Sequence, residues 1–163
     1  MILWKKKDSS IFKSRSEEDT RRLAAFLAEL LSGGEVIFLR GPIGAGKTTF
    51  VKGVAEALGM PASPVSASFS LLKQYRNGAM TVYHIDLFRL KSADMANLGF
   101  EEMLENEKAV ILAEWPDPIA DMLPRDRLEI SFELLKGDGR RIAAESHGEV
   151  SGRLLDSLKN SFE

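Results

Sequence analysis

Residues 35–59 read EVIFLRGPIGAGKTTFVKGVAEALG. A short apolar run, residues 35–39, is followed by a glycine-rich segment, residues 41–48, and then by a helical pattern that Gly59 closes. Residues 41–48 match the pattern G-x-x-x-x-G-K-[ST] at every defined position. In such a strand, loop and helix, glycines let backbone N–H groups point at phosphate oxygens, and the helix adds its positive end. This stretch predicts a phosphate-binding loop of the Walker A type.

The motif also assigns chemistry to individual residues. The position of Lys47 predicts contacts with the β- and γ-phosphates of a nucleotide, and that of Thr48 predicts a hydroxyl ligand for Mg²⁺. The predicted cofactors are therefore a nucleoside triphosphate and Mg²⁺. The residues expected to bind the nucleotide are Gly41, Gly44, Ala45, Gly46, Lys47, Thr48 and Thr49.

The segment before the loop predicts an amphipathic helix. Leucine and phenylalanine recur at intervals of three and four in TRRLAAFLAELLSGG, residues 20–34. Ser14 with Glu17, or Ser16 with Asp19, is the expected capping pair, and the two glycines at 33 and 34 are expected to end the helix.

The segment after the loop predicts hairpins, two short helical stretches and one more buried strand. Residues 60–70, rich in proline and serine, are expected to be a loop. Asn77-Gly78 predicts a hairpin turn, and the turn-rich residues 136–140 predict a second one. FEEMLENEK and the last fifteen residues or so predict helices, and AVILAE, residues 109–114, predicts a buried strand. The predicted fold class is α/β: a P-loop NTPase-like three-layer domain with a mixed, mainly parallel central sheet and β-hairpins.

Length and composition predict one domain, residues 1–163, of ordinary globular character. Apolar residues make up 44% of the chain and charged residues 28%, the formal net charge is -2, and there is no cysteine. This composition excludes disulfides and zinc–thiolate sites. A weakly acidic chain has no global positive field for nucleic acid, so any such role is expected to run through a partner or a local patch. The N-terminus has neither a signal pattern nor a membrane span, and a cytoplasmic protein is predicted.

Nucleotide hydrolysis needs a carboxylate near the phosphates, usually at the end of a neighbouring strand. Asp86 ends TVYHID, and Glu114 ends VILAE. At least one of them is expected to serve Mg²⁺, whereas without the phosphate loop each reads as a solvated acid at a strand end. The chain lacks the Asn-Lys-x-Asp motif by which GTPases read guanine. A small-molecule kinase needs an arginine-rich lid, for which PRDR, residues 124–127, is the nearest candidate, although it equally suits an exposed loop.

Taken together, these motifs resemble the bacterial TsaE (YjeE) family of P-loop ATPases, which take part in making N6-threonylcarbamoyladenosine (t6A) in tRNA. The resemblance covers roughly residues 17–149, and its landmarks are GPIGAGKTTF, VSASFSLL, YHIDLFRL, LGFEEML and AEWPD. The pairing of HIDLFRL with EWP downstream of this loop is highly specific, since few other P-loop proteins are expected to show both. Two departures stand out: SASF replaces the usual SPTF or SPTY, and GPIGAGKT replaces GDLGAGKT. The hydroxyl of Ser68 keeps a metal or phosphate contact available, and the loop is expected to be less rigid without the proline.

The resemblance implies roles for single residues. Lys47 holds the phosphates, Thr48 and Glu114 serve the metal, and Asp86 is the hydrolysis-critical acid near the γ-phosphate. Residues 66–69 become a nucleotide-sensing switch. Trp115 is either a site-adjacent aromatic or a packing residue.

Four further residues are interpreted from their chemistry and their place in the sequence. Thr20 and Arg140 match polar positions near the family's nucleotide, or are a helix-start hydroxyl and a hairpin surface charge. His84 shares a strand face with Asp86 and is interpreted as a structural histidine bonded to backbone. His147, in SHGE, is interpreted as a loop residue.

The function expected from the resemblance is Mg²⁺-dependent binding and slow hydrolysis of ATP, required for t6A modification and acting on the TsaB–TsaD complex. The tRNA is then reached indirectly through that complex, and no membrane is involved. Hydrolysis is expected to be stimulated by the partners, because the sequence offers no evident arginine finger. A small-molecule P-loop kinase is the main alternative, and a nucleotide-dependent binding module is the third possibility.

Overall fold

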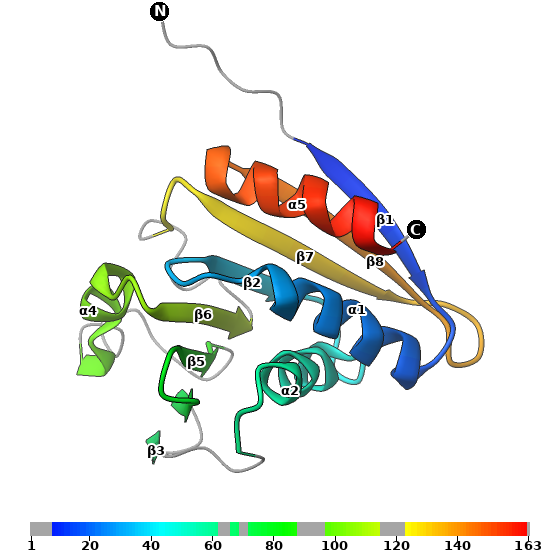
Figure 1. Cartoon of the computed structure of the whole chain (residues 1–163). Coiled ribbons are helices and arrows are strands. Elements are labelled where there is room, and N and C mark those ends of the chain that lie inside the picture. The colour runs from blue at the N-terminus through cyan, green and yellow to red at the C-terminus, as the bar shows by residue number, and fades with distance from the viewer. Residues whose placement is uncertain (1–7, 62–65, 69–71, 88–96, 115–122, 163) are drawn as a thin grey trace, which may run out of the picture.

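The structure, a computed structural model, describes residues 8–61, 66–68, 72–87, 97–114 and 123–162 (Figure 1). Strands and helices alternate up to residue 57, and a long hairpin and a helix make up the end of the chain. The elements in chain order are β1 (Ser9–Ser14), α1 (Glu17–Leu30), β2 (Val36–Arg40), α2 (Lys47–Ala57), β3 (Ser66–Ser68), β4 (Leu72–Arg76), β5 (Thr81–Asp86), α4 (Phe100–Glu105), β6 (Ala109–Glu114), β7 (Arg127–Leu134), β8 (Arg140–His147) and α5 (Glu149–Phe162).

The strands form one sheet in the order β1-β8-β7-β2-β6-β5-β4-β3. Its four central strands, β7, β2, β6 and β5, run parallel to one another. The outer strands on both sides pair antiparallel. This pairing confirms the predicted α/β fold with a mixed sheet that is parallel at its centre. Strands that are buried on both faces favour parallel pairing under crossover helices.

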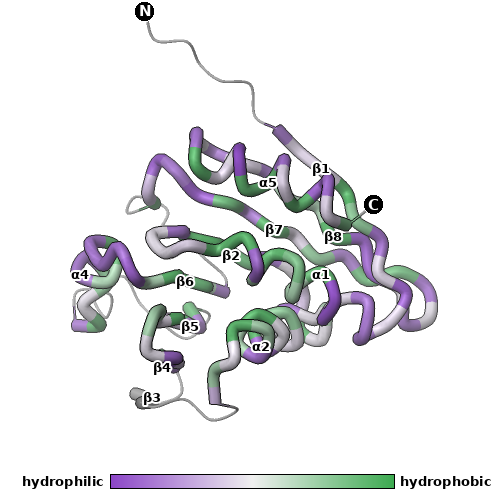
Figure 2. Tube along the Cα trace, viewed as in Figure 1, coloured by the Kyte–Doolittle hydropathy of each residue, from purple (hydrophilic) through white to green (hydrophobic). Residues whose placement is uncertain are grey.

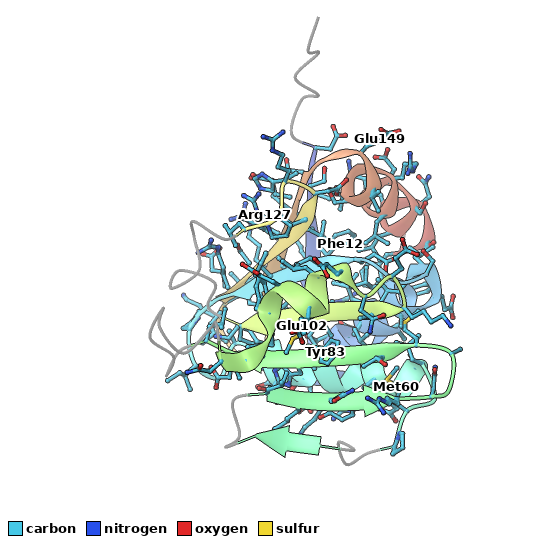
Figure 3. All side chains as sticks on the ribbon, turned by 90° about the vertical axis from the view of Figure 1, so that its left-hand side faces the viewer. Phe12, Met60, Tyr83, Glu102, Arg127 and Glu149 are labelled. Atoms are coloured by element: carbon cyan, nitrogen blue, oxygen red, sulfur yellow. The ribbon has the colours of Figure 1, made fainter. Side chains whose placement is uncertain are left out.

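Helices cover both faces of this sheet, which gives three layers. α1, α2 and α5 pack on one face against a large apolar cluster that includes Leu27, Phe50, Leu112 and Ile130. α4 packs on the other face against a smaller cluster that includes Phe38. Figure 2 shows the apolar character of β2 and β6 between these layers. Figure 3 looks from the α4 side, with Glu102 on α4 in front of β5, which carries Tyr83.

The start of α1 is capped by the second of the two pairs that the sequence offers. Ser16 is the N-cap, and its Oγ accepts a hydrogen bond of 3.1 Å from the backbone N–H of Asp19. The Asp19 carboxylate accepts in turn from the backbone N–H of Arg15 at 2.9 Å. Ser14 has a different role, since it ends β1 and its hydroxyl bonds to Ser16 O and to the Thr20 hydroxyl.

Both predicted hairpins are present. β4 and β5 pair antiparallel, and the Asn77 side-chain carbonyl accepts from the backbone N–H groups of Ala79 and Met80, which closes the turn. β7 and β8 form the second hairpin over their full eight residues. The helix predicted near residue 100, the buried strand ending at Glu114 and the final helix are confirmed as α4, β6 and α5.

Two strands were not predicted. β1 is an edge strand on which Phe12 is buried while Ile11 is 55% exposed, so it has too few apolar side chains to show a period. β3 covers only three residues of the segment that the composition predicted to be a loop. In both cases the strand depends on backbone pairing with β8 or β4, which side-chain patterns do not reveal.

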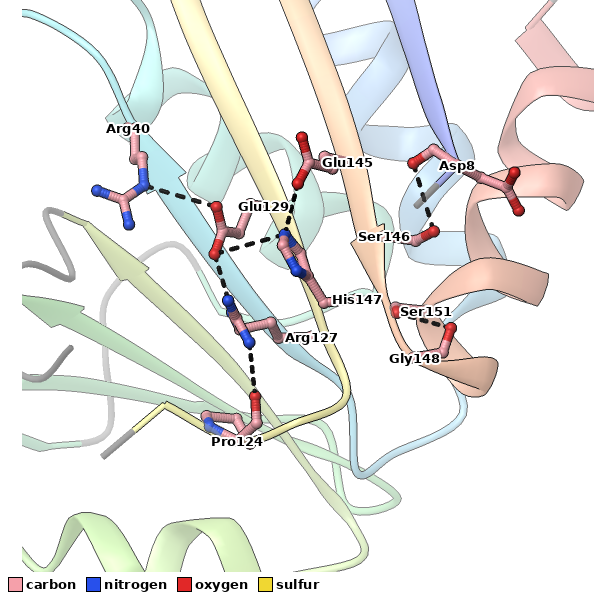
Figure 4. A network of polar contacts seen from close by, with 10 residues as sticks. All are labelled: Asp8, Arg40, Pro124, Arg127, Glu129, Glu145, Ser146, His147, Gly148 and Ser151. Atoms are coloured by element: carbon pink, nitrogen blue, oxygen red, sulfur yellow. Dashed lines mark hydrogen bonds and ion pairs between the residues drawn. The ribbon is translucent and has the colours of Figure 1, made fainter. Parts of the chain in front are cut away.

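A polar network on the α4 face of the sheet corrects two interpretations (Figure 4). His147 is the last residue of β8 rather than a loop residue, and its Nε2 lies 2.8 Å from the Glu145 carboxylate. Arg127, from the candidate lid, begins β7 and donates hydrogen bonds to Glu129 and to Pro124 O. β7 runs parallel to β2, so residues 124–127 lie at the end of the sheet where β2 begins, opposite the phosphate loop. They therefore form no lid over that loop.

The described part of the chain contains no helix with the length and apolar character that a membrane crossing needs.

The contact between α1 and α2 gives a stability prediction. A Cβ added to Gly53 of α2 would lie 2.9 Å from the Ala24 Cβ and 3.3 Å from the Arg21 Cα. Gly53→Ala is expected to lower the free energy of unfolding by about 1–2 kcal/mol, because overpacking outweighs the gain in helix propensity. Urea denaturation measures the change. The matched control is Gly152→Ala in α5, where the nearest atom lies 3.9 Å away, and this variant should be stabilised by up to about 1 kcal/mol. Equal effects of the two substitutions would contradict the close helix packing.

Candidate functional site

The glycine-rich loop follows β2, and its conformation requires glycine at two positions. Gly41 has φ +146, and a Cβ there would lie 2.7 Å from Phe132 O on β7. Gly46 has φ +107 and is the N-cap of α2. A side chain at Gly46 would meet Arg140, whose Nε would be 3.1 Å from the added Cβ. The loop is therefore wrapped closely against β7 and β8, with the N-terminus of α2 behind it.

Lys47 is the first residue of α2, and its side chain folds back over the loop. Its ammonium donates to Gly41 O and to Pro42 O, the latter at 3.4 Å, and the residue is only 5% exposed. Burial lowers the pKa of Lys47, while the carboxylates of Glu114 and Asp86 oppose that shift. A buried ammonium beside a nest of backbone N–H groups is a site suited to an anion.

The two predicted carboxylates are brought together by the parallel strands of the sheet. Asp86 of β5 is the register partner of Glu114 of β6, and Glu114 is also paired with Leu39 at the end of β2. Both acids thus lie where the strands end and the loop begins. The sequence-based expectation that each of these acids ends a strand is confirmed by β5 and β6.

Glu114 connects the sheet to α2. Its side chain is buried, and its Oε1 accepts from the Thr48 hydroxyl at 3.4 Å. The same oxygen lies 2.8 Å from Nε2 of His84 on β5. His84 was interpreted as bonded to backbone, and this interpretation is wrong: its partner is the Glu114 carboxylate. A buried carboxylate favours a hydrogen-bonding side chain beside it, since an unpaired charge in the interior is costly.

Arg140 approaches the loop from the far hairpin. It begins β8, and its Nε donates a 2.9 Å hydrogen bond to Ala45 O, while its NH1 donates to Asp138 O at 2.8 Å. The alternative of a surface charge on a hairpin is therefore wrong for Arg140, which is half-buried against the phosphate loop. Thr20, in contrast, is buried, and its hydroxyl bonds to Ser14 and Ser16, as expected for a helix-start hydroxyl.

A cleft of about 500 Å³ lies over these groups. Most of the residues predicted for the site line it, together with three others. The lining residues are Glu17, Ile43, Gly44, Gly46, Lys47, Thr48, Thr49, Asp86, Glu114 and Arg140. Gly41 and Ala45 do not line the cleft, and their carbonyls accept hydrogen bonds from Lys47 and Arg140.

The charges of the cleft are nearly balanced but slightly acidic. Lys47 and Arg140 contribute two positive charges, and Glu17, Asp86 and Glu114 contribute three negative ones, which leaves a formal charge of -1. In the described residues, no three His, Cys, Asp or Glu side chains gather as a metal site made of protein alone. A divalent cation in this cleft would draw on Thr48 and Glu114 together with phosphate oxygens and water, which is how Mg²⁺ usually binds.

Several predicted residues stand apart from this description. Trp115 and Phe69 lie outside the described residues. Ser66–Ser68 form β3 at the edge of the sheet, next to β4. The switch predicted for residues 66–69 and the role of Trp115 thus stay predictions.

Sequence reasoning missed the contacts of two residues that the fold brings to the site. His84 was placed on the correct strand face, and the alternation with Asp86 could have suggested a contact with the neighbouring acidic strand end. Glu17 was noticed only as a capping residue, and no local signal predicts that the first turn of α1 reaches the rim of the cleft.

Comparisons with known proteins agree on one family. The family profile described as "Threonylcarbamoyl adenosine biosynthesis protein TsaE" matches residues 14–142. The chain is 33% identical over 147 residues to the tRNA threonylcarbamoyladenosine biosynthesis protein TsaE of Bacillus subtilis, covering 90% of this chain and 92% of the relative. It is 37% identical over 151 residues to the TsaE of Rickettsia conorii, covering 90% and 85% of the two chains. The crystal structure of YdiB from Bacillus subtilis superposes with a TM-score of 0.82 at 30% identity, covering 97% of this chain and 99% of the other.

The contact of Arg140 with the loop gives a prediction with a neighbouring control. Arg140→Ala is expected to lower the free energy of unfolding by about 0.5–1.5 kcal/mol, because a partly buried hydrogen bond to Ala45 O is lost. Arg141→Ala removes only an exposed ion pair with Glu133 and should change stability by less than about 0.5 kcal/mol. Urea denaturation of both variants measures the difference. Equal losses would show that Arg140 does not support the loop.

Proposed function

Because the chain belongs to the TsaE family, we propose that it binds ATP with Mg²⁺, hydrolyses it slowly, and is required for t6A modification of tRNA. In this proposal residues 1–163 act as one P-loop ATPase domain in the cytoplasm. The domain acts on the TsaB–TsaD complex, and the tRNA is reached through that complex. The observation that carries the proposal is the convergence of Lys47, Thr48 and two strand-end carboxylates in one cleft.

The charge of the cleft supports binding of a nucleotide together with a metal. ATP carries several negative charges, and a cleft with a formal charge of -1 repels them unless a cation enters as well. Thr48 and Glu114 are the side chains that would hold Mg²⁺, which would neutralise part of the phosphate charge. Their oxygens already lie 3.4 Å apart.

Each of the protein's own groups in the cleft would have a separate role. The Lys47 ammonium, now donating to loop carbonyls, would turn its hydrogen bonds to phosphate oxygens and stabilise the charge that develops there. The backbone N–H groups of Gly44 and of residues 46–49 would cradle the phosphates. Asp86 lines the same cleft and would accept a hydrogen bond from the attacking water and orient it toward the γ-phosphorus.

Dependence on partners follows from the residues that the cleft lacks. Among the described residues that line it, Arg140 is the only arginine, and its Nε is engaged by Ala45 O. An arginine that stabilises the transferring phosphoryl group accelerates related enzymes by about 10³–10⁵. In the isolated protein we therefore expect slow turnover, which the TsaB–TsaD complex stimulates.

The position of residues 124–127, the candidate lid, does not support the kinase alternative. Residues 124–127, the candidate lid, lie at the opposite end of β7 from the phosphate loop. The proposal predicts release of free phosphate in the absence of any metabolite. A metabolite that is phosphorylated and abolishes that release would favour a kinase instead.

A charge-neutralising substitution tests the role of the metal. Glu114→Gln removes one negative charge from the cleft. With Mg²⁺ present, ATP binding should weaken by about tenfold or more, on the scale at which lost metal contacts reduce affinity. With EDTA present, the same variant should bind ATP more tightly than wild type, because one repulsive carboxylate is gone. Calorimetric titration measures both, and the exposed Glu102→Gln on α4 is the control. Weakening by Glu114→Gln in both conditions would contradict a metal-side role.

A second test separates binding from hydrolysis. Lys47→Ala should weaken ATP binding by about 10- to 100-fold, since hydrogen bonds to charged groups contribute about 1.5–3 kcal/mol. Asp86→Ala should keep ATP binding while hydrolysis falls by about 10²- to 10⁴-fold. Both variants should fail to support t6A formation in a reaction reconstituted with TsaB and TsaD.

Three outcomes of that reaction decide between the functions. Rapid ATP turnover by the isolated protein, unchanged by TsaB and TsaD, would contradict the regulator. Full t6A formation with Asp86→Ala but none with Lys47→Ala would favour a binding module in which hydrolysis is incidental. Full t6A formation with both variants would remove the link to this pathway.

A further inference from the structure

The buried contact between His84 and Glu114 has no role in the function proposed above. Glu114 ends a strand whose six residues are all buried, and only 7% of Glu114 is exposed. Its Oε1 lies 2.8 Å from Nε2 of His84 and 3.4 Å from the Thr48 hydroxyl. The histidine contact is the short one, and a hydrogen bond of that length to an ionised acceptor is among the stronger ones in proteins.

The sheet fixes the direction of this contact. His84 is the register partner of Leu112, and Asp86 is the register partner of Glu114, so the imidazole reaches Glu114 diagonally along the strand pair. An ionised carboxylate only accepts hydrogen bonds, which makes Nε2 the protonated donor of the ring. His84 itself is 7% exposed, so water competes little with the contact.

We propose that His84 is a positioning residue that holds the Glu114 carboxylate in the orientation required to bind Mg²⁺. This inference rests on the proposed function, in which Glu114 is a metal-side carboxylate. If the Thr48 hydroxyl served Mg²⁺, it would release Oε1, and His84 would remain as the donor that fixes the carboxylate. Donors of this kind behind a metal ligand commonly change metal affinity by about 10- to 100-fold when they are removed.

A purely structural histidine gives a different expectation. If His84 only satisfied a buried charge, its loss would lower the stability of the fold and leave metal affinity in the folded protein unchanged. The test therefore compares thermal stability with metal affinity in the same variants.

The variants are His84→Phe, which keeps a ring but no donor, and His84→Gln, which offers an amide N–H toward Oε1. Affinity for Mn²⁺ is measured by electron paramagnetic resonance on the full chain bound to a non-hydrolysable ATP analogue. His84→Phe should weaken Mn²⁺ binding by about 10- to 100-fold, and His84→Gln should restore most of it. Binding of the analogue in EDTA should match wild type for both. Wild-type Mn²⁺ affinity in His84→Phe, or equal losses in both variants, would overturn the inference.

A measurement on wild type covers the case in which His84→Phe does not fold. Nitrogen-15 spectra of the histidines should show a hydrogen on Nε2 of His84, both without ligand and with Mg²⁺ and the analogue. A ring with no hydrogen on Nε2 in the metal-bound state would overturn the inference.

Glu114→Gln separates this inference from the proposed function. If Glu114→Gln weakens Mn²⁺ binding while His84→Phe does not, the inference about His84 fails alone. If Glu114→Gln leaves Mn²⁺ binding unchanged, Glu114 is not a metal-side group, and the proposed function fails together with the inference.

Discussion

The in-register parallel pairing of β2, β6 and β5 is the constraint on which the site depends. It sets Glu114 beside Leu39 on one strand and beside Asp86 on the other, next to the point where the chain leaves β2 for the phosphate loop. Side chains alternate between the two faces of a strand, so a slip of one residue would turn Glu114 toward α4 and away from Thr48. Glu114 itself opposes such a slip, because its carboxylate would lose His84 and Thr48 and enter the apolar cluster under α4, where an unpaired charge is costly.

The buried charges of the cleft already have partners inside the protein. Lys47 donates to carbonyls of its own loop, and Glu114 accepts from His84 and Thr48. Removing water from these groups is the costly part of building such a site, and it is accomplished when the chain folds. In the proposed function, Lys47 and Thr48 would exchange these partners for phosphate oxygens and Mg²⁺, while His84 would stay bonded to Glu114. Because His84 would remain the donor to the carboxylate, its loss is expected to act on metal affinity as well as on stability.

What the sequence could predict depended on how local each signal was. The phosphate loop, the helix cap at Ser16 and the turn at Asn77 are set by residues within a few positions of one another, and the structure places each as expected. The placement of Asp86 and Glu114 at strand ends was also predicted, because a run of apolar residues indicates a buried strand and the acid that follows it marks the end. β1 and β3 could not be predicted, since they exist through backbone pairing with distant strands. The contacts of His84 with Glu114 and of Arg140 with Ala45 likewise depend on which strands become neighbours. A single sequence does not specify that order.

The second hairpin explains why the rest of the fold is needed around a motif of eight residues. Phe132 O of β7 leaves room only for glycine at position 41. The ring of Phe132 packs edge to face on the ring of Phe50 of α2, with the two ring centroids 5.7 Å apart. Arg140 of β8 holds Ala45 O from the other side. The loop and the start of α2 are thus fixed by a hairpin that lies some ninety residues later in the chain. These contacts come from the protein's own groups, and they hold the backbone of the loop in its wrapped conformation. In the proposed function, this fixed backbone would position the phosphates, and Asp86 and Lys47 in the same cleft would then orient the attacking water and stabilise the developing charge.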